Sequence, residues 1–243
     1  MKKFIFVIFI IIFLIPKVSG WNFETHKAIV DEVYFSMPAD LQENLDLDLI
    51  RKGSITPDKY FKDHKMHSYP NSYDKALYWL NITKNSLKNK DYENASYAFG
   101  IATHYISDSF SAPHNIKGEE YYLHSRFEDQ VKNIDIECRK FDYDLNLSLF
   151  KATKNNEDWE EWLKGYNKEI PEKEVGEAMG LIYTVALDIF NTTCTPRNTE
   201  VINEKFKIGN KAKIFGIFLI LFLFIIIFDV VKKKSLDRKN ICL

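Results

Sequence analysis

The sequence predicts an all-α fold, a compact multi-helix domain followed by one transmembrane helix. Glycine is rare, with 9 in 243 residues, and hydrophobic residues make up 46% of the chain. Apolar side chains recur at spacings of three and four residues, which is the period of amphipathic helices rather than of strands. The chain is long enough for one sizeable core but short for two full domains.

Helix boundaries follow from this periodicity and from capping residues. Asp91 is the expected N-cap of the fourth helix, Pro113 follows the end of that helix, and Pro171 is expected to open the last helix. Polar, irregular stretches at 52–70 and 138–156 predict loops. Helices are predicted over residues 24–36, 39–51, 72–89, 92–110, 119–134, 157–165 and 172–192.

Both ends of the chain carry membrane-directed patterns. Residues 1–20 join two lysines, an apolar run and small residues before a cleavage point, which predicts a signal peptide removed after Gly20. An uncleaved signal anchor is the alternative. Residues 214–231 are apolar apart from Asp229 and predict a membrane-spanning helix. The expected order is therefore a domain over 21–194, a stalk over 195–213, this helix, and a basic cytoplasmic tail over 232–243.

This order places the domain outside the cytoplasm, on a single-pass protein of the cell membrane. Residues 21–200 carry 21 Lys and Arg against 31 Asp and Glu, a net charge of −10. Such a surface repels polyanions unless bound metal ions offset it. Cys138 and Cys194 lie on the oxidising side and either pair or stay free, whereas Cys242 is expected to be reduced.

The histidines are confined to residues 26–124 and lie beside carboxylates. His104 and Asp108 stand at i and i+4 on one predicted helix, and His124 and Glu128 repeat that spacing on the next. One such pair is commonly a surface hydrogen bond, but two pairs with His114 between them favour a metal site. Imidazole and carboxylate together suit zinc, and four or fewer protein ligands per ion leave positions open for catalysis.

The complete pattern resembles the zinc-dependent phospholipase C family, and it is similar to that of the fungal single-strand-specific nucleases. The resemblance covers about residues 21–190, nearly the whole expected domain. It rests on Trp21, His26, Asp58 and His67, followed by His104-x3-Asp108-x5-His114 and His124-x3-Glu128.

Carried over residue by residue, the resemblance implies three zinc ions inside an all-helical domain. The implied ligands are Asp58, His67, His104 and Asp108 for the first ion, Trp21 (amine and carbonyl), His26 and the shared Asp108 for the second, and His114, His124 and Glu128 for the third. An α-amine has a pKa of about 7.7–8.0, so it can lose its proton and bind metal near neutrality. This role of Trp21 requires cleavage at one particular bond.

The sequence leaves some assignments open. His64 competes with His67 for the first ion, and Asp63 competes weakly with Asp58. The short spacing from Trp21 to His26 is typical of the nuclease branch. Glu24, in contrast, matches the position where the phospholipases carry an acidic residue beside the choline headgroup. The interval from His114 to His124 is shorter than in either branch.

Four aromatic residues surround the expected ligands in the sequence. Tyr121, Tyr122, Phe110 and Phe127 are expected to belong to the core rather than to stack on a substrate.

The function expected from these observations is a phospholipase C reaction on phospholipid headgroups. In it, a metal-activated water attacks the phosphate and the glycerol–phosphate bond is cleaved. Asp58 would bind metal and orient or deprotonate that water. The acidic domain, Glu24 and the membrane helix favour a phospholipid substrate. The alternatives are a single-strand-specific nuclease or other phosphoesterase, which alone would bind nucleic acid, and an inactive zinc-binding surface protein. Headgroup preference and oligomeric state stay open.

Overall fold

The computed structural model describes residues 23–131, 136, 140–154 and 156–193, and within these ranges it contains helices and no strand. The all-α prediction is therefore confirmed for this part of the chain. The elements are α2 (Phe23–Phe35), α3 (Ala39–Asn44), α4 (Leu47–Ser54), the π-helical η1 (Pro57–Phe61), the 3-10 helix η2 (His64–Met66), α5 (Asn71–Lys88), α6 (Tyr92–Phe110), the 3-10 helix η3 (Ala112–Asn115), α7 (Tyr121–Glu128), α8 (Leu145–Ala152), α9 (Asn156–Gly165) and α10 (Glu169–Ile189).

Several predictions lie outside the described residues. They are the signal peptide 1–20, Trp21, the stalk 195–213, the apolar helix 214–231, the tail 232–243, and the two cysteines Cys138 and Cys194. By its internal contacts the chain divides into residues 1–197 and 198–243, and the described residues all belong to the first unit. None of the helices in the described ranges combines the length and apolar character needed to cross a bilayer.

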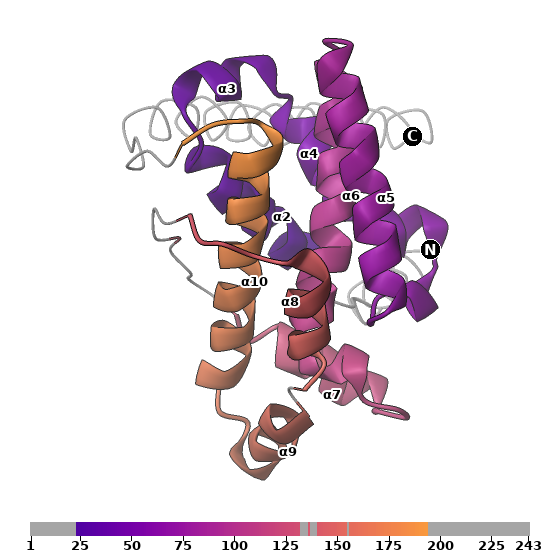
Figure 1. The fold of residues 1–243 in the computed structure, drawn as a ribbon. Helices are drawn as coiled ribbons and strands as arrows, with labels where there is room; N and C mark the ends of the chain where they lie inside the picture. Colours follow the sequence, from indigo (N-terminus) through magenta and orange to yellow (C-terminus); the bar gives the residue numbers. More distant parts are fainter. Residues whose placement is uncertain (1–22, 132–135, 137–139, 155, 194–243) are drawn as a thin grey trace, which may run out of the picture. The chain divides into compact units, whose positions relative to one another are not determined.

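Helix α6 is the central helix of the domain. It is buried without interruption from Ala98 to Phe110, and α4, α5 and α10 pack against it (Figure 1). A helix buried on all sides must satisfy each of its polar side chains internally. Ser107 and Ser109 do so by donating to carbonyls of the preceding turn, at 2.9 and 2.8 Å. His104 and Asp108 face other elements instead.

The end of α4 lies very close to α6 because both helices have glycine at the contact. A Cβ on Gly53 would lie 2.3 Å from the carbonyl oxygen of Tyr97 and 3.0 Å from the Cα of Gly100. Only glycine permits this approach. As a consequence, the carbonyl oxygen of Ser54 reaches 2.7 Å from Nδ1 of His104.

Some predicted boundaries are confirmed, and others are wrong for identifiable reasons. Asp91 caps α6 by accepting a hydrogen bond from the backbone N–H of Asn94 at 3.1 Å, as predicted. The predicted helix 39–51 is two helices, because Asp46 accepts from the N–H of Leu49 at 3.0 Å and starts α4 afresh. The predicted 119–134 helix is α7, which already ends at Glu128, and residues 52–70 contain η1 and η2.

The loop predicted for 138–156 is wrong for residues 145–152, which form α8. Asp144 caps this helix by accepting from the N–H of Leu147 at 2.9 Å, and Leu149 and Ala152 are buried. The last helix begins at Glu169 and ends at Ile189, so Pro171 lies in its first turn, as expected. Proline is tolerated there because the N–H groups of the first turn have no intrahelical partner.

An aromatic cluster joins the segments that follow α6. Phe127 of α7 packs against Trp159 and Trp162 of α9 and against Ala112 of η3, and all four are buried. Phe110 and Phe127 are therefore core residues, as expected. The same expectation is wrong for Tyr121 and Tyr122, because the first turn of α7 points to solvent and leaves these side chains 54% and 67% exposed.

Candidate metal centre

Asp108 is the centre of the histidine cluster. It lies one turn after His104 on α6, and its carboxylate is buried. Oδ2 lies 3.1 Å from Nε2 of His104 and 2.8 Å from Nδ1 of His67. The same oxygen is 3.6 Å from Nε2 of His114, and Oδ1 is 3.4 Å from Nε2 of His26. One carboxylate thus faces four imidazoles from different elements.

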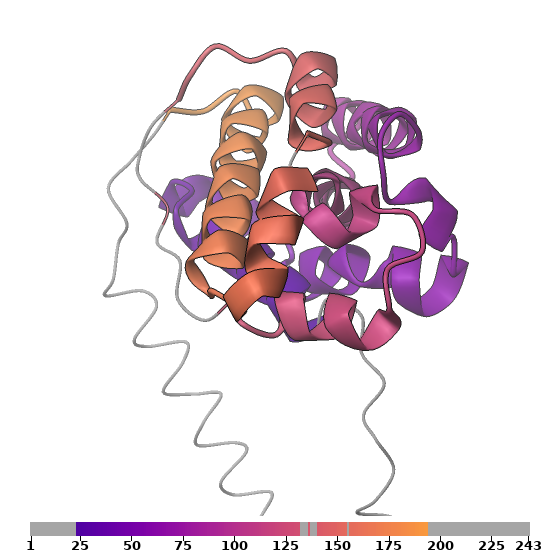
Figure 2. The same ribbon diagram turned by 90° about the horizontal axis from the view of Figure 1, so that it is seen from below.

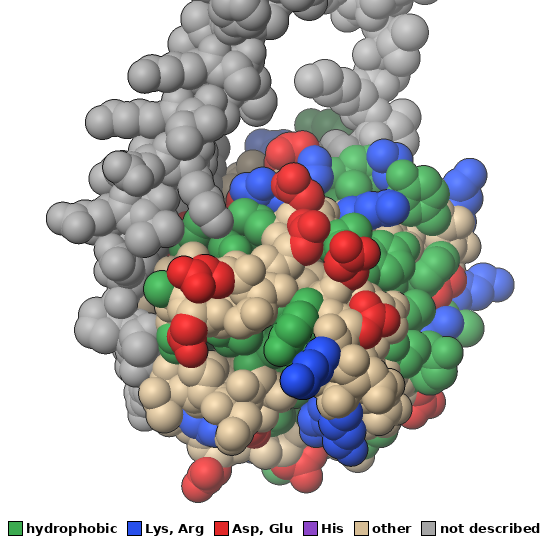
Figure 3. Space-filling view, turned by 90° about the horizontal axis from the view of Figure 1, so that it is seen from above, with side chains coloured by type: hydrophobic (Ala, Val, Ile, Leu, Met, Phe, Trp, Pro, Cys, Tyr) green, Lys and Arg blue, Asp and Glu red, His purple; other side chains and the backbone are tan. Residues whose placement is uncertain are grey.

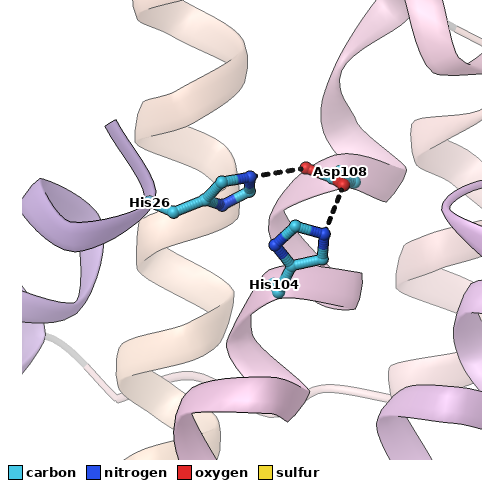
Figure 4. A group of neighbouring side chains, drawn as sticks. All are labelled: His26, His104 and Asp108. Carbon is cyan, nitrogen blue, oxygen red and sulfur yellow. Dashed lines mark ion pairs between the residues drawn. The ribbon is translucent and has the colours of Figure 1, made fainter. Parts of the chain in front are cut away.

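Helix α2 contributes His26 from the amino-terminal side. Figure 4 shows its ring pointing at Asp108 from α2 while the ring of His104 approaches the other carboxylate oxygen from α6. The ring centroids of His26 and His104 are 4.1 Å apart. These three residues can offer ligand atoms that all lie within 4.8 Å of one another.

The short elements η1 and η2 contribute Asp58 and His67. The π-helical turn of η1 begins at Pro57 and turns Asp58 towards the cluster, with Oδ1 3.7 Å from Nδ1 of His67 and 3.8 Å from Nε2 of His104. Asp58, His67 and His104 form a second possible ligand group. The Asp58 side chain keeps 14% of its surface exposed, so this part of the cluster is open to solvent.

The segment after α6 contributes the third region of the cluster. Nε2 of His124 lies 2.9 Å from Oε1 of Glu128, one turn later on α7, and Nε2 of His114 lies 3.4 Å from the same oxygen. These three residues form one possible ligand group, and His67, Asp108 and His114 form another that connects it to the rest. The cluster is therefore continuous from α2 to α7.

Outer contacts fix which ring nitrogen faces the centre. The carbonyl oxygen of Ser54 lies 2.7 Å from Nδ1 of His104, and a carboxylate oxygen of Glu119 lies 3.3 Å from Nδ1 of His124. Both rings therefore turn Nε2 inward. His67 is reversed, because its Nε2 lies 3.5 Å from Oδ1 of Asp63 and its Nδ1 faces Asp108. Carboxylate and carbonyl partners of this kind orient metal-binding histidines.

Many inward-facing atoms of the cluster have no hydrogen-bond partner among the described residues. Nε2 of His104, Nε2 of His114 and both oxygens of Asp108 are buried in this state, and so is Nδ1 of His67. Buried polar atoms are nearly always satisfied, so this concentration calls for a ligand. Nitrogen and oxygen lone pairs that converge from several elements match the ligands of zinc. The donor set therefore fits a zinc centre.

The protonation of the cluster shows how strongly its charges interact. Burial depresses the pKa of His104, but the neighbouring Asp108 carboxylate outweighs it and raises this pKa to about 9. Burial likewise opposes the charge of His124, and Glu128 raises its pKa to about 9. Burial disfavours the charged form of Asp108 as well, yet the surrounding histidines hold its pKa well below the usual range. The carboxylates thus favour positively charged histidines, and bound metal cations can supply that positive charge instead.

The structure brings together every expected ligand among the described residues, namely His26, Asp58, His67, His104, Asp108, His114, His124 and Glu128. His64 does not join the possible ligand groups. Its side chain is 70% exposed; its Nδ1 lies 3.5 Å from Oδ1 of Asp58, and its ring centroid lies 5.7 Å from that of His67. Glu24 lies on α2 one turn before Lys27, to which it is ion-paired at 2.9 Å, and 72% of its side chain is exposed.

Sequence reasoning did not identify the outer partners of the cluster. Asp63 was considered only as a rival of Asp58 for a metal ion, but it lies behind His67 and also accepts a hydrogen bond from Tyr105 at 2.8 Å. Glu119 and the Ser54 carbonyl were not considered. Nothing in the sequence marks the carbonyl, because any residue could supply it. The carboxylates carry a weak signal, since each lies within five positions of a histidine.

Comparisons with known proteins give one match. A family model described as zinc-dependent phospholipase C matches residues 25–174. That range contains all the residues of the possible ligand groups and stops short of both ends of the chain. No curated protein and no solved structure matches this sequence.

Proposed function

The chain belongs to the zinc-dependent phospholipase C family. From this premise we propose that it is a zinc-dependent phospholipase C, which hydrolyses the bond between glycerol and the phosphate of a phospholipid headgroup. The observation that carries the proposal is the buried cluster around Asp108, whose ligand groups run from α2 to α7. The family match supports the hydrolase class, and the donor set supports zinc.

The proposed centre holds three zinc ions, divided as the family resemblance implies. Asp58, His67, His104 and Asp108 bind the first ion. His26 and Asp108 bind the second, together with the amine and carbonyl of Trp21. The third is bound by His114, His124 and Glu128. The possible ligand groups overlap at His67, His104, Asp108 and His114, which supports a centre in which the ions are neighbours.

The bound zinc would supply Lewis acidity, an activated water and stabilisation of the leaving oxygen. The protein residues have separate tasks around it. Asp108 is fully buried and holds the inner histidines in place by its charge. Asp58 is partly exposed and close to the same histidines, so its free lone pairs can orient a water and accept its proton. The His114 side chain is 15% exposed and its Nε2 lies 3.4 Å from Oε1 of the buried Glu128.

We also propose the location of the reaction. The apolar helix 214–231 would anchor the chain in the cell membrane and keep the hydrolase domain outside the cytoplasm, next to its phospholipid substrate. Glu24 would contact the headgroup, for which it would have to exchange its ion pair with Lys27 for the substrate's cation.

The test uses the chain expressed with its own signal segment, so that removal of residues 1–20 frees the Trp21 amine; it is loaded with zinc and assayed on a soluble short-chain phospholipid and on single-stranded DNA. Diacylglycerol release is expected, and it should vanish in Asp108→Ala together with zinc binding, because this carboxylate faces four of the histidines. Asp74→Ala, which removes an exposed carboxylate on α5, is the matched control and should behave as wild type. Full activity in Asp108→Ala would refute the site.

A second candidate is a single-strand-specific nuclease. The exposed Tyr60, Tyr121 and Tyr122 favour it, because bases stack on accessible aromatic rings. Its signature in the same assay is cleavage of DNA without release of diacylglycerol. Bound zinc with neither activity would indicate a binding protein that has kept the metal centre.

A further inference from the structure

Exposed aromatic side chains lie on both sides of the metal cluster. Tyr60 and Phe61 follow Asp58 on η1 and are 57% and 43% exposed. Tyr121 and Tyr122 precede His124 on α7 and are exposed to a similar extent. Single exposed hydrophobic residues are normal, but a group that borders a site indicates an interaction surface.

The two aromatic pairs belong to one end of the domain. Figures 1 and 2 show the purple segment of residues 57–66 and the pink helix α7 near the same end of α6, the end that carries Asp108. Besides burial, the charges of Glu128 on its own helix, of Asp58 on η1 and of Asp129 raise the pKa of the Tyr121 phenol.

Basic residues accompany the aromatic residues. Lys59, Lys62 and Lys65 are exposed, and together with Lys117 they form no ion pair within the described part of the chain. The ammonium of Lys59 lies over the Tyr60 ring, 5.3 Å from its centroid. Acidic and basic side chains are intermixed over the face in Figure 3, which looks at the molecule from above.

We propose that these residues form a membrane-docking rim that rests on a phospholipid bilayer and presents the metal centre to the headgroups. The rim comprises Tyr60, Phe61, Tyr121 and Tyr122 with Lys59, Lys62, Lys65 and Lys117. Tyrosine and lysine suit the interface, because their apolar parts enter the headgroup layer while hydroxyl and ammonium groups stay hydrated. This inference rests on the proposed phospholipase function.

A bilayer fits the rim better than a nucleic-acid strand does. A bound strand needs positive charge along its whole path. The η1 side of the rim supplies it, but the α7 side carries Glu119, Glu120 and Asp129 beside its tyrosines. A bilayer requires no such continuous track, since aromatic insertion on one side and lysine contacts on the other both contribute to docking.

The test uses the zinc-loaded chain, from which residues 1–20 have been removed by signal cleavage, mixed with vesicles of phosphatidylcholine and phosphatidylglycerol. Hydroxyl-radical footprinting should show the rim aromatics protected on vesicles compared with detergent, while Leu147 on α8, which is 48% exposed, should not change. Hydrolysis of vesicle lipid and of a soluble short-chain phospholipid is measured in parallel.

Two variants separate docking from catalysis. Replacing Lys59, Lys62 and Lys65 by Gln should lower hydrolysis of vesicle lipid by at most about fivefold per lysine, because the helix 214–231 would still keep the chain on the vesicle, and leave the soluble substrate unaffected. The matched control replaces Lys84 and Lys88 near the end of α5 and Lys90 in the turn after it. It makes the same change of charge and should not lower hydrolysis of vesicle lipid. The double variant Tyr60→Ser and Tyr122→Ser should also lower hydrolysis of vesicle lipid and spare the soluble substrate. Leu147→Ser is its control and should change neither.

The outcomes distinguish the two proposals. Rim protection with a selective loss on vesicles supports the inference. Unchanged footprints, or equal losses in the rim and control variants, overturn it. Protection by single-stranded DNA in place of vesicles also overturns it and assigns the rim to nucleic acid. Rim protection on vesicles without hydrolysis of either lipid supports the docking surface but refutes the phospholipase function.

Discussion

Asp63 tests how residues outside the ligand set contribute to zinc affinity, because it lies beside the ring nitrogen of His67 that faces away from Asp108. Its Oδ1 lies 3.5 Å from Nε2 of His67, and its Oδ2 accepts a hydrogen bond from Tyr105 at 2.8 Å and lies 3.4 Å from the ammonium of Lys75. Asp63→Asn keeps the shape and an acceptor for Tyr105 but removes the charge that makes His67 a more basic ligand. Losing such a partner weakens metal binding by about 10–100-fold.

The geometry favours the lower end of that range. The contact with His67 is long, and 19% of the Asp63 side chain is exposed, so solvent screens part of its charge. We expect zinc affinity about tenfold weaker, equivalent to about 1.4 kcal/mol.

The assay is competition with a chelator, followed by counting zinc per chain. Asp74→Asn, an exposed carboxylate on α5, controls for the loss of one negative charge. Tyr105→Phe should weaken binding in the same direction, and its effect should not add to that of Asp63→Asn, since both act through one contact. A chelator midpoint for Asp63→Asn equal to that of Asp74→Asn would refute the reasoning.

Three further predictions concern the ligands, pH and packing. His67→Ala should lose zinc and activity while His64→Ala retains both, because only His67 is buried in the cluster; equal effects would reopen the choice. Burial raises the pKa of Glu174 from an ordinary 4.5 to about 9, so the folded state holds a proton that the unfolded chain releases. Stability should therefore fall as pH rises between these values, by about 3 kcal/mol from pH 6 to 8, and denaturant titrations should show this slope abolished in Glu174→Gln. Gly53→Ala should destabilise the fold by about 1–3 kcal/mol in thermal unfolding, because its Cβ would lie 2.3 Å from the Tyr97 carbonyl oxygen. An unchanged melting temperature would contradict that close contact.

The sequence was informative where local physics dominates. Apolar periodicity predicted most of the helices, and Asp91 marked the start of α6 because an N-cap is a local contact. The spacing of His104 and Asp108 predicted that they share a helix face, and they do. The same reasoning failed for α8, since the polar residues around it hid a short helix that is held by the burial of Leu149 and Ala152.

Other parts of the site depend on contacts between distant segments. His64 and His67 were nearly equivalent in the sequence, and only the turn of η2 against α6 buried one and exposed the other. The role of Asp63 likewise depends on Tyr105, 42 residues later. Tyr121 and Tyr122 resembled core residues until the position of α7 placed them at the surface.

The sequence by itself thus determined the helical class, the family and the residues able to bind zinc, because spacing along a helix is a local property. Only the tertiary structure decided which of those residues converge on Asp108, which ring nitrogen each histidine turns inward, and which aromatic residues surround the opening. The physical reason is that metal ligands and docking surfaces are assembled from segments far apart in the chain, and their meeting depends on packing such as the close approach of Gly53 to α6.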